Sequence, residues 1–123
     1  MSFALELADS ELRDVVAEGA AVRLRFAAAA VRDDAGERGW LASVQLEIAG
    51  ATLDGDTPQA FGRIAQGSLR HDGGAARLSV PGALSGEVEL ALALANGTRL
   101  VVHGQALVAS AAEGAVFTPD LSC

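Results

Sequence analysis

The sequence has 123 residues, of which 50% are hydrophobic and 20% charged, and its formal net charge is −7. A chain of this length suits a single domain with its own core, and the composition is that of a folded, acidic protein rather than a disordered one. All the basic residues are arginines scattered along the chain, so no basic stripe forms that could hold a phosphate backbone or an anionic membrane surface. We therefore expect neither a nucleic-acid partner nor a membrane partner.

The N-terminal stretch "MSFALELADSELRD" has neither a basic segment nor a continuous apolar one, so it does not have the pattern of a signal peptide. No run of the sequence approaches the ~18 apolar residues of a membrane-spanning helix. The single cysteine, Cys123, cannot form a disulfide within the chain. These features predict a cytoplasmic protein.

The segment at residues 10–18 permits two structures. Leu12, Val15 and Val16 have helical spacing and Gly19 could end the helix, which would give one short helix here. Alternatively, the segment is the first arm of a β-hairpin that turns at Gly19. We favour the hairpin because the neighbouring segments have the pattern of strands.

A resemblance supports this choice. The stretch "LADSELRDVVAEGAAVRLRF" at residues 7–26 resembles the first hairpin of small all-β bacterial proteins, some of them immunity-type proteins. The resemblance implies β structure at this end of the chain, and it assigns a function to no residue.

The run "GWLASVQLEIAG" alternates with a period of two, which is typical of a half-buried strand. It places Trp40 on the same face as Ala42, Val44, Leu46 and Ile48. We therefore expect Trp40 in the core, where its N–H needs a partner.

The second half of the chain continues the pattern of short strands and turns. We expect a loop at residues 51–62, strands at 62–71 and 75–80, and a hairpin turn at Asp72-Gly73. Turn residues recur about every ten positions, which is typical of a sandwich or barrel. The sequence predicts an all-β fold of about eight mostly antiparallel strands, in a sandwich or a flattened barrel. It forms a single domain, 1–123, whose tail, 111–123, packs on the domain or on a partner chain.

The stretch "LALANGTRLVVHGQAL" predicts a hairpin whose register can be argued from its side chains. A two-residue loop would place Leu90 opposite His103 and bury polar groups among leucines, which costs about 1–3 kcal/mol each. A three-residue loop of residues 95–97, with Gly97 in the left-handed conformation, places Glu89 opposite His103 instead. One face of the hairpin then becomes apolar, and the hydrophobic pattern therefore favours the longer loop.

This register leaves a second, partly apolar face on the hairpin, made of Ala91, Ala93, Val101 and Leu107. A strand in an ordinary one-sided sheet would be more polar there. Either a further layer covers this face or the face is an interface. His103 and Glu89 also point to this side, either as an acid–base pair or as an ordinary solvent-facing pair of opposite strands.

The sequence contains no catalytic or cofactor motif. The two histidines and one terminal cysteine have no zinc spacing, and the phosphate-binding glycine patterns are missing. We therefore expect no enzyme activity, no metal site and no cofactor.

Two functions remain open. The first is a non-catalytic protein-interaction or self-assembling β-domain, with a homodimer as the favoured form. The alternative is a β-barrel that binds a small apolar ligand, which requires a pocket lined by Leu, Val and Ala. The candidate interaction or polar residues are His103, Glu89, Trp40, Phe117 and Leu121.

Overall fold

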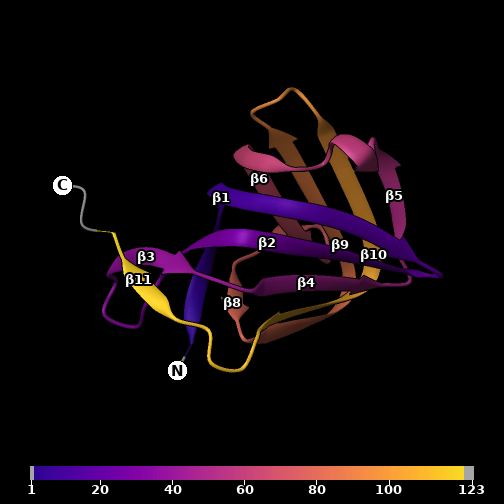
Figure 1. Ribbon diagram of the computed structural model, residues 1–123. Helices are drawn as coiled ribbons and strands as arrows, with labels where there is room; N and C mark the ends of the chain where they lie inside the picture. The colour runs from indigo at the N-terminus through magenta and orange to yellow at the C-terminus, as the bar shows by residue number, and fades with distance from the viewer. Residues whose placement is uncertain (1, 121–123) are drawn as a thin grey trace.

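The computed structural model describes residues 2–120, which form eleven strands and one short 3-10 helix (Figure 1). The elements are β1 (Phe3–Glu18), β2 (Ala21–Arg32), β3 (Arg38–Leu41), β4 (Val44–Ala49), β5 (Thr52–Gly55), η1 (Thr57–Gln59), β6 (Gly62–His71), β7 (Gly74–Ala75), β8 (Leu78–Val80), β9 (Gly82–Leu94), β10 (Arg99–Ala111) and β11 (Phe117–Pro119). The predicted all-β class is confirmed, whereas the predicted number of about eight strands is too small. The difference arises from short strands in segments that lack a clear alternation.

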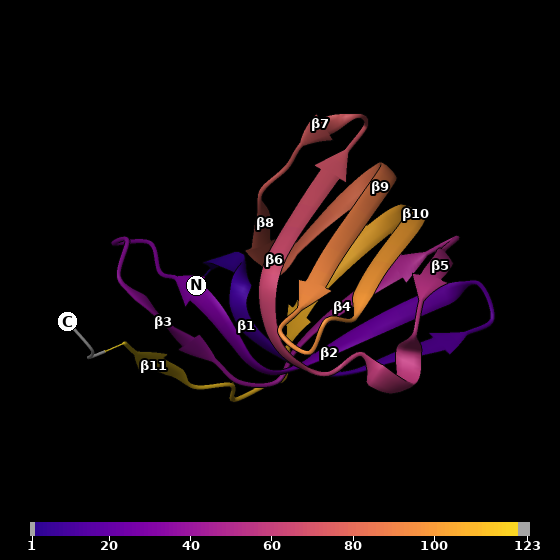
Figure 2. The same ribbon diagram turned by 90° about the horizontal axis from the view of Figure 1, so that it is seen from above.

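Six antiparallel strands close into a barrel, because β1 pairs with β2 on one side and with β6 on the other. The order around the barrel is β1-β2-β4-β10-β9-β6. The other five strands lie outside this ring: β3 and β11 extend it beside β2, β5 pairs with β10, β7 with β6, and β8 with β1. Figure 2 shows β6, β9 and β10 on one side of the barrel and β1, β2 and β4 on the other. The structure is thus a barrel rather than a two-sheet sandwich.

The expectation of a short helix near residues 10–18 is wrong. This segment belongs to β1, and Glu18 pairs with Ala21 across a tight turn. The hairpin alternative is confirmed. Gly19 at the turn has φ +58°, a left-handed conformation that glycine adopts without strain. Long-range pairing with β2 and burial of alternate side chains therefore override the helical spacing of Leu12 and Val15.

The run 40–48 is not one continuous strand. It divides into β3 and β4, and Ser43 between them has φ +61°. The interruption moves Leu41 into the core, leaves Ala42 exposed and leaves Trp40 only partly buried. The expected position of Trp40 in the core is therefore wrong, because alternation cannot be carried across the turn.

The segment 51–62 is more ordered than predicted, since it contains β5 and η1. β5 pairs with β10, and Val101 lies beside Asp54. The predicted strand 62–71 is confirmed as β6, and the predicted turn at Asp72-Gly73 joins it to β7. The predicted strand 75–80 is instead divided into β7 and β8, with residues 76 and 77 between them.

The register predicted for the β9–β10 hairpin is confirmed: His103 pairs with Glu89 and Val102 with Leu90. The loop has three residues, because the N–H of Leu94 donates to the carbonyl of Thr98, and Gly97 has φ +92°. The side-chain amide of Asn96 at the tip donates to the carbonyls of Gln59 and Phe61.

The register shifts farther along the same hairpin, between Gly104 and Ala106. As a result, Leu107 is fully buried and Val108 points outward with 50% of its surface exposed. The sequence assignment of Leu107 to the second face is wrong, because a β-bulge reverses which side chains point inward.

The barrel interior is filled by aliphatic side chains from all six strands. The largest fully buried side chains, two of which come from the flanking strands β3 and β8, are Leu12, Leu24, Leu41, Leu46, Ile48, Ile64, Leu90, Leu100, Leu107, Val31, Val44 and Val80. No helix in the described residues 2–120 has the length and apolar character needed to cross a membrane.

Candidate functional site

His103 and Glu89 form a solvent-facing pair on the outside of the barrel. The Nδ1 atom of His103 lies 3.6 Å from Oε2 of Glu89, and the two side chains are 54% and 43% exposed. A pair this exposed gives little stabilisation. It also lies on an open sheet surface rather than in a cleft that excludes water, so its geometry supports an ordinary cross-strand pair.

Trp40 and Phe117 lie at the other end of the molecule, on β3 and β11. Phe117 is half-buried and stacks on Phe3 with ring centroids 5.3 Å apart. Its ring also lies directly over Gly39, where a Cβ would overlap it. β11 pairs with β3, so this part of the tail packs on its own domain. Leu121 lies outside the described residues.

The outward side of β6, β9 and β10 forms a surface of small side chains, which we call the alanine face. It consists of Gln66, Ser68, Ala91, Ala93, Arg99 and Val101. Pairing aligns Ser68 with Ala91 and Val101 in one row, and Gln66 with Ala93 and Arg99 in the next. Ala91, Ala93 and Val101 are only partly buried, so within residues 2–120 no further layer covers them.

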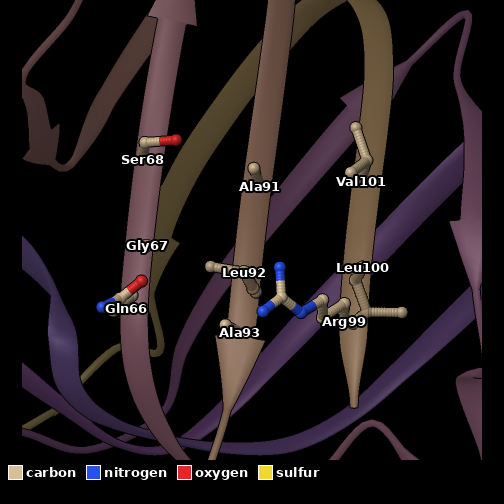
Figure 3. Close-up of a pocket in the computed structure, with 9 residues that line it drawn as sticks. All are labelled: Gln66, Gly67, Ser68, Ala91, Leu92, Ala93, Arg99, Leu100 and Val101. Atoms are coloured by element: carbon tan, nitrogen blue, oxygen red, sulfur yellow. The ribbon is translucent and has the colours of Figure 1, made fainter. Parts of the chain in front are cut away.

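The alanine face is hollowed into an open depression of about 300 Å³, which the six residues line together with Gly67, Leu92 and Leu100 (Figure 3). The hollow exists because alanine and glycine side chains are short while Gln66 and Arg99 at its margin are long. In Figure 3 the side chain of Arg99 reaches from β10 toward β9, where its guanidinium lies near Ala93 and Leu92.

Arg99 makes no hydrogen bond or ion pair with another described residue. Asp54 of β5, which the register places beside Val101 on the same side of the sheet, has no such partner among them either. The alanine face and the neighbouring strand β5 therefore carry one cation and one anion that the described residues leave unpaired.

The outward side of β1, β2 and β4 differs in this respect. Arg23 pairs there with Glu47 at 3.0 Å and with Glu18 at 3.6 Å, and Arg25 pairs with Asp14. The hydrogen bond from Arg25 lowers the pKa of Asp14, and the carboxylate of Glu47 raises the pKa of Arg23. This side is a ladder of paired charges suited to water, which leaves the alanine face as the better candidate for binding.

The described residues contain no group of three or more His, Cys, Asp or Glu side chains placed to hold a metal ion. Comparisons of the chain with protein-family models, with curated proteins and with solved structures find no match. The candidate site therefore stands on its geometry alone.

The sequence predicted the alanines and valine of this site but missed Gln66, Ser68 and Asp54. The register predicted for the hairpin places Arg99 opposite Ala93, and the structure confirms this pairing. The contributions of β5 and β6 could not be predicted, since they depend on which strands flank the hairpin.

Proposed function

We propose that this protein is a non-catalytic, self-assembling β-domain that packs its alanine face against the same face of a second copy. The observation that carries the proposal is the uncovered row of Ala91, Ala93 and Val101 beside the unpaired Arg99. An apolar surface with a polar margin is typical of an interaction site. Short side chains allow two such sheets to approach closely.

Charge favours a second copy over an unrelated partner. A two-fold dimer brings each residue of one copy against a different residue of the other, and the reverse contact follows by symmetry. Arg99 and Asp54 have opposite charge, lie on the same face and lack partners among the described residues. In such a dimer Arg99 of each copy can pair with Asp54 of the other.

Light scattering coupled to gel filtration tests the assembly. We expect the wild-type protein to have a measured molar mass twice the chain mass of 12.5 kDa. Ala91→Arg should give a folded monomer, because a long charged side chain would stand at the centre of the interface. The matched control is Ala27→Arg, at an exposed position of β2, and it should remain dimeric. Wild-type protein that stays monomeric, or a dimer that survives Ala91→Arg, would contradict the proposal.

A charge exchange tests the orientation. Arg99→Asp and Asp54→Arg should each weaken the dimer, since each places like charges opposite one another. The double variant should recover it, because the two charges are then simply interchanged. If the dimer of the double variant is weakened by the sum of the two single effects, the two-fold contact between Arg99 and Asp54 is contradicted.

A further inference from the structure

The pairing that closes the barrel between β1 and β6 is short. Within the described residues these strands pair only at Glu11 with Arg63 and at Leu12 with Gly62. Nearer its N-terminus, β1 pairs with β8 instead, and β6 pairs with β7 at its far end. Figure 2 shows β7 at the far end of β6 and β8 alongside β6. A wall with so short a pairing can admit a ligand.

A depression of about 280 Å³ lies between β1 and β6 beyond this short pairing, and we call it the seam crevice. It is lined by Leu5, Leu7, Gly67, Ser68, Leu69, Ala75, Ala76, Arg77 and Leu78. It lies on the other side of β6 from most of the alanine face, and the two depressions share only Gly67 and Ser68.

The floor of the seam crevice is apolar and continuous with the core. Leu69 and Leu78 belong to the core and are 6% and 5% exposed, while Leu5 and Leu7 pack against it and remain partly open. Gly67 makes room for this arrangement, since a Cβ there would lie only 2.7 Å from the Cβ of Leu7. The crevice can therefore bury an alkyl chain against leucine side chains.

The margin of the seam crevice is cationic. Its nine lining residues include no Asp or Glu, although the chain has 16 acidic residues. Arg77 is exposed at the margin and makes no hydrogen bond or ion pair with another described residue. Ser68 adds a hydroxyl donor. An arginine without a partner beside an apolar floor suits an anionic head group on an apolar chain.

We propose that the seam crevice binds a medium-length alkyl carboxylate, with its chain on Leu5, Leu7 and Leu78 and its carboxylate at Arg77. The volume of about 280 Å³ is just below the roughly 300–1,000 Å³ typical of ligand pockets, which favours a short single chain over a full-length lipid. The residues proposed to hold the chain and the carboxylate lie outside the alanine face, and the two depressions share only Gly67 and Ser68.

Calorimetric titration of the full chain with decanoate, kept below its micelle concentration, tests the proposal. We expect saturable binding of one decanoate per chain, and weaker binding of decanol. Arg77→Gln should weaken decanoate about tenfold, as the loss of one charge-assisted hydrogen bond predicts, and should leave decanol unchanged. Arg99→Gln is the matched control, since it removes another arginine that makes no hydrogen bond or ion pair with a described residue, and it should leave decanoate affinity unchanged.

Amide chemical shifts of the wild-type protein locate the site without any variant. Decanoate should shift the signals of residues 5–7, 67–69 and 75–78. Equal affinity of Arg77→Gln and wild type for decanoate, or shifts confined to β9 and β10, would overturn the proposal. The calorimetric titration and the chemical-shift measurement are repeated on the Ala91→Arg variant. Decanoate binding by this variant would show that the ligand site does not depend on the proposed dimer.

Discussion

The hydroxyl of Ser10 accepts a hydrogen bond from the backbone N–H of Ala30 at 2.8 Å and donates one to the carbonyl of Glu6 at 2.6 Å. Ser10 is fully buried, in a stretch of β1 where residues 7–10 lie opposite only residue 29 of β2. One side chain therefore replaces the backbone pairing that the bulge interrupts.

Replacement of Ser10 by alanine should lower the free energy of unfolding by about 1–3 kcal/mol, because the Ala30 N–H is left buried without an acceptor. Urea denaturation followed by circular dichroism measures the change. Ser110→Ala, at an exposed position of β10, is the control and should have almost no effect. Equal midpoints for the two variants would show that the Ser10 bridge contributes nothing.

Gly104 has no room for a side chain. A Cβ at this position would overlap Cγ2 of Ile48 and lie 2.9 Å from the carbonyl oxygen of Ala49. Gly104→Ala should therefore destabilise the barrel by roughly 1–3 kcal/mol. Gly74→Ala is the matched control, since its nearest neighbour would be 3.9 Å away, and thermal unfolding should hardly change.

The same clash predicts a coupling between two positions. Ile48→Leu removes the branch at Cβ that a Gly104→Ala side chain would meet, so the second substitution should cost less in that background. A double-mutant cycle measures the difference. Strictly additive losses would place the cost of Gly104→Ala elsewhere, for example at the backbone of Ala49.

The ion pair of Asp14 with Arg25 should give a pH-dependent contribution to stability. The hydrogen bond from Arg25 holds the pKa of Asp14 below its ordinary value of 3.8 in the folded state. The contribution is therefore fully present above pH 3.8 and is lost as the pH falls through the lower, folded-state pKa. Asp14→Asn should be slightly less stable than wild type at pH 7, and the difference should vanish in strong acid.

Urea denaturation across this pH range provides the measurement. Asp56→Asn serves as control, because the Asp56 side chain makes no hydrogen bond or ion pair with a described residue. A stability difference for Asp14→Asn that stays constant from pH 7 to strong acid would contradict an electrostatic origin.

The pair of His103 and Glu89 should contribute little, since both side chains are about half exposed. We expect His103→Gln and Glu89→Gln each to change the free energy of unfolding by less than about 0.5 kcal/mol. Thermal unfolding of the two variants and wild type checks this. A large loss from either substitution would show that the pair has a structural role that its exposure does not suggest.

Local features of the sequence were sufficient for the hairpin of β9 and β10. Its turn and its alternating leucines lie within one continuous stretch, so only one register separates apolar from polar side chains, and Glu89 does lie opposite His103. The same reasoning failed at Leu107, because the bulge between Gly104 and Ala106 reverses the alternation.

The sequence by itself determined the all-β class, the hairpin register and the existence of a partly apolar second face with Ala91, Ala93 and Val101. Only the tertiary structure decided that β1 closes a barrel, that β5 and β6 bring Asp54, Gln66 and Ser68 beside that face, and that a crevice opens between β1 and β6. The physical reason is the distance along the chain between the residues that interact. Alternation determines which side chains share a face within one strand pair, whereas closure, bulges and depressions depend on contacts between segments far apart in the chain.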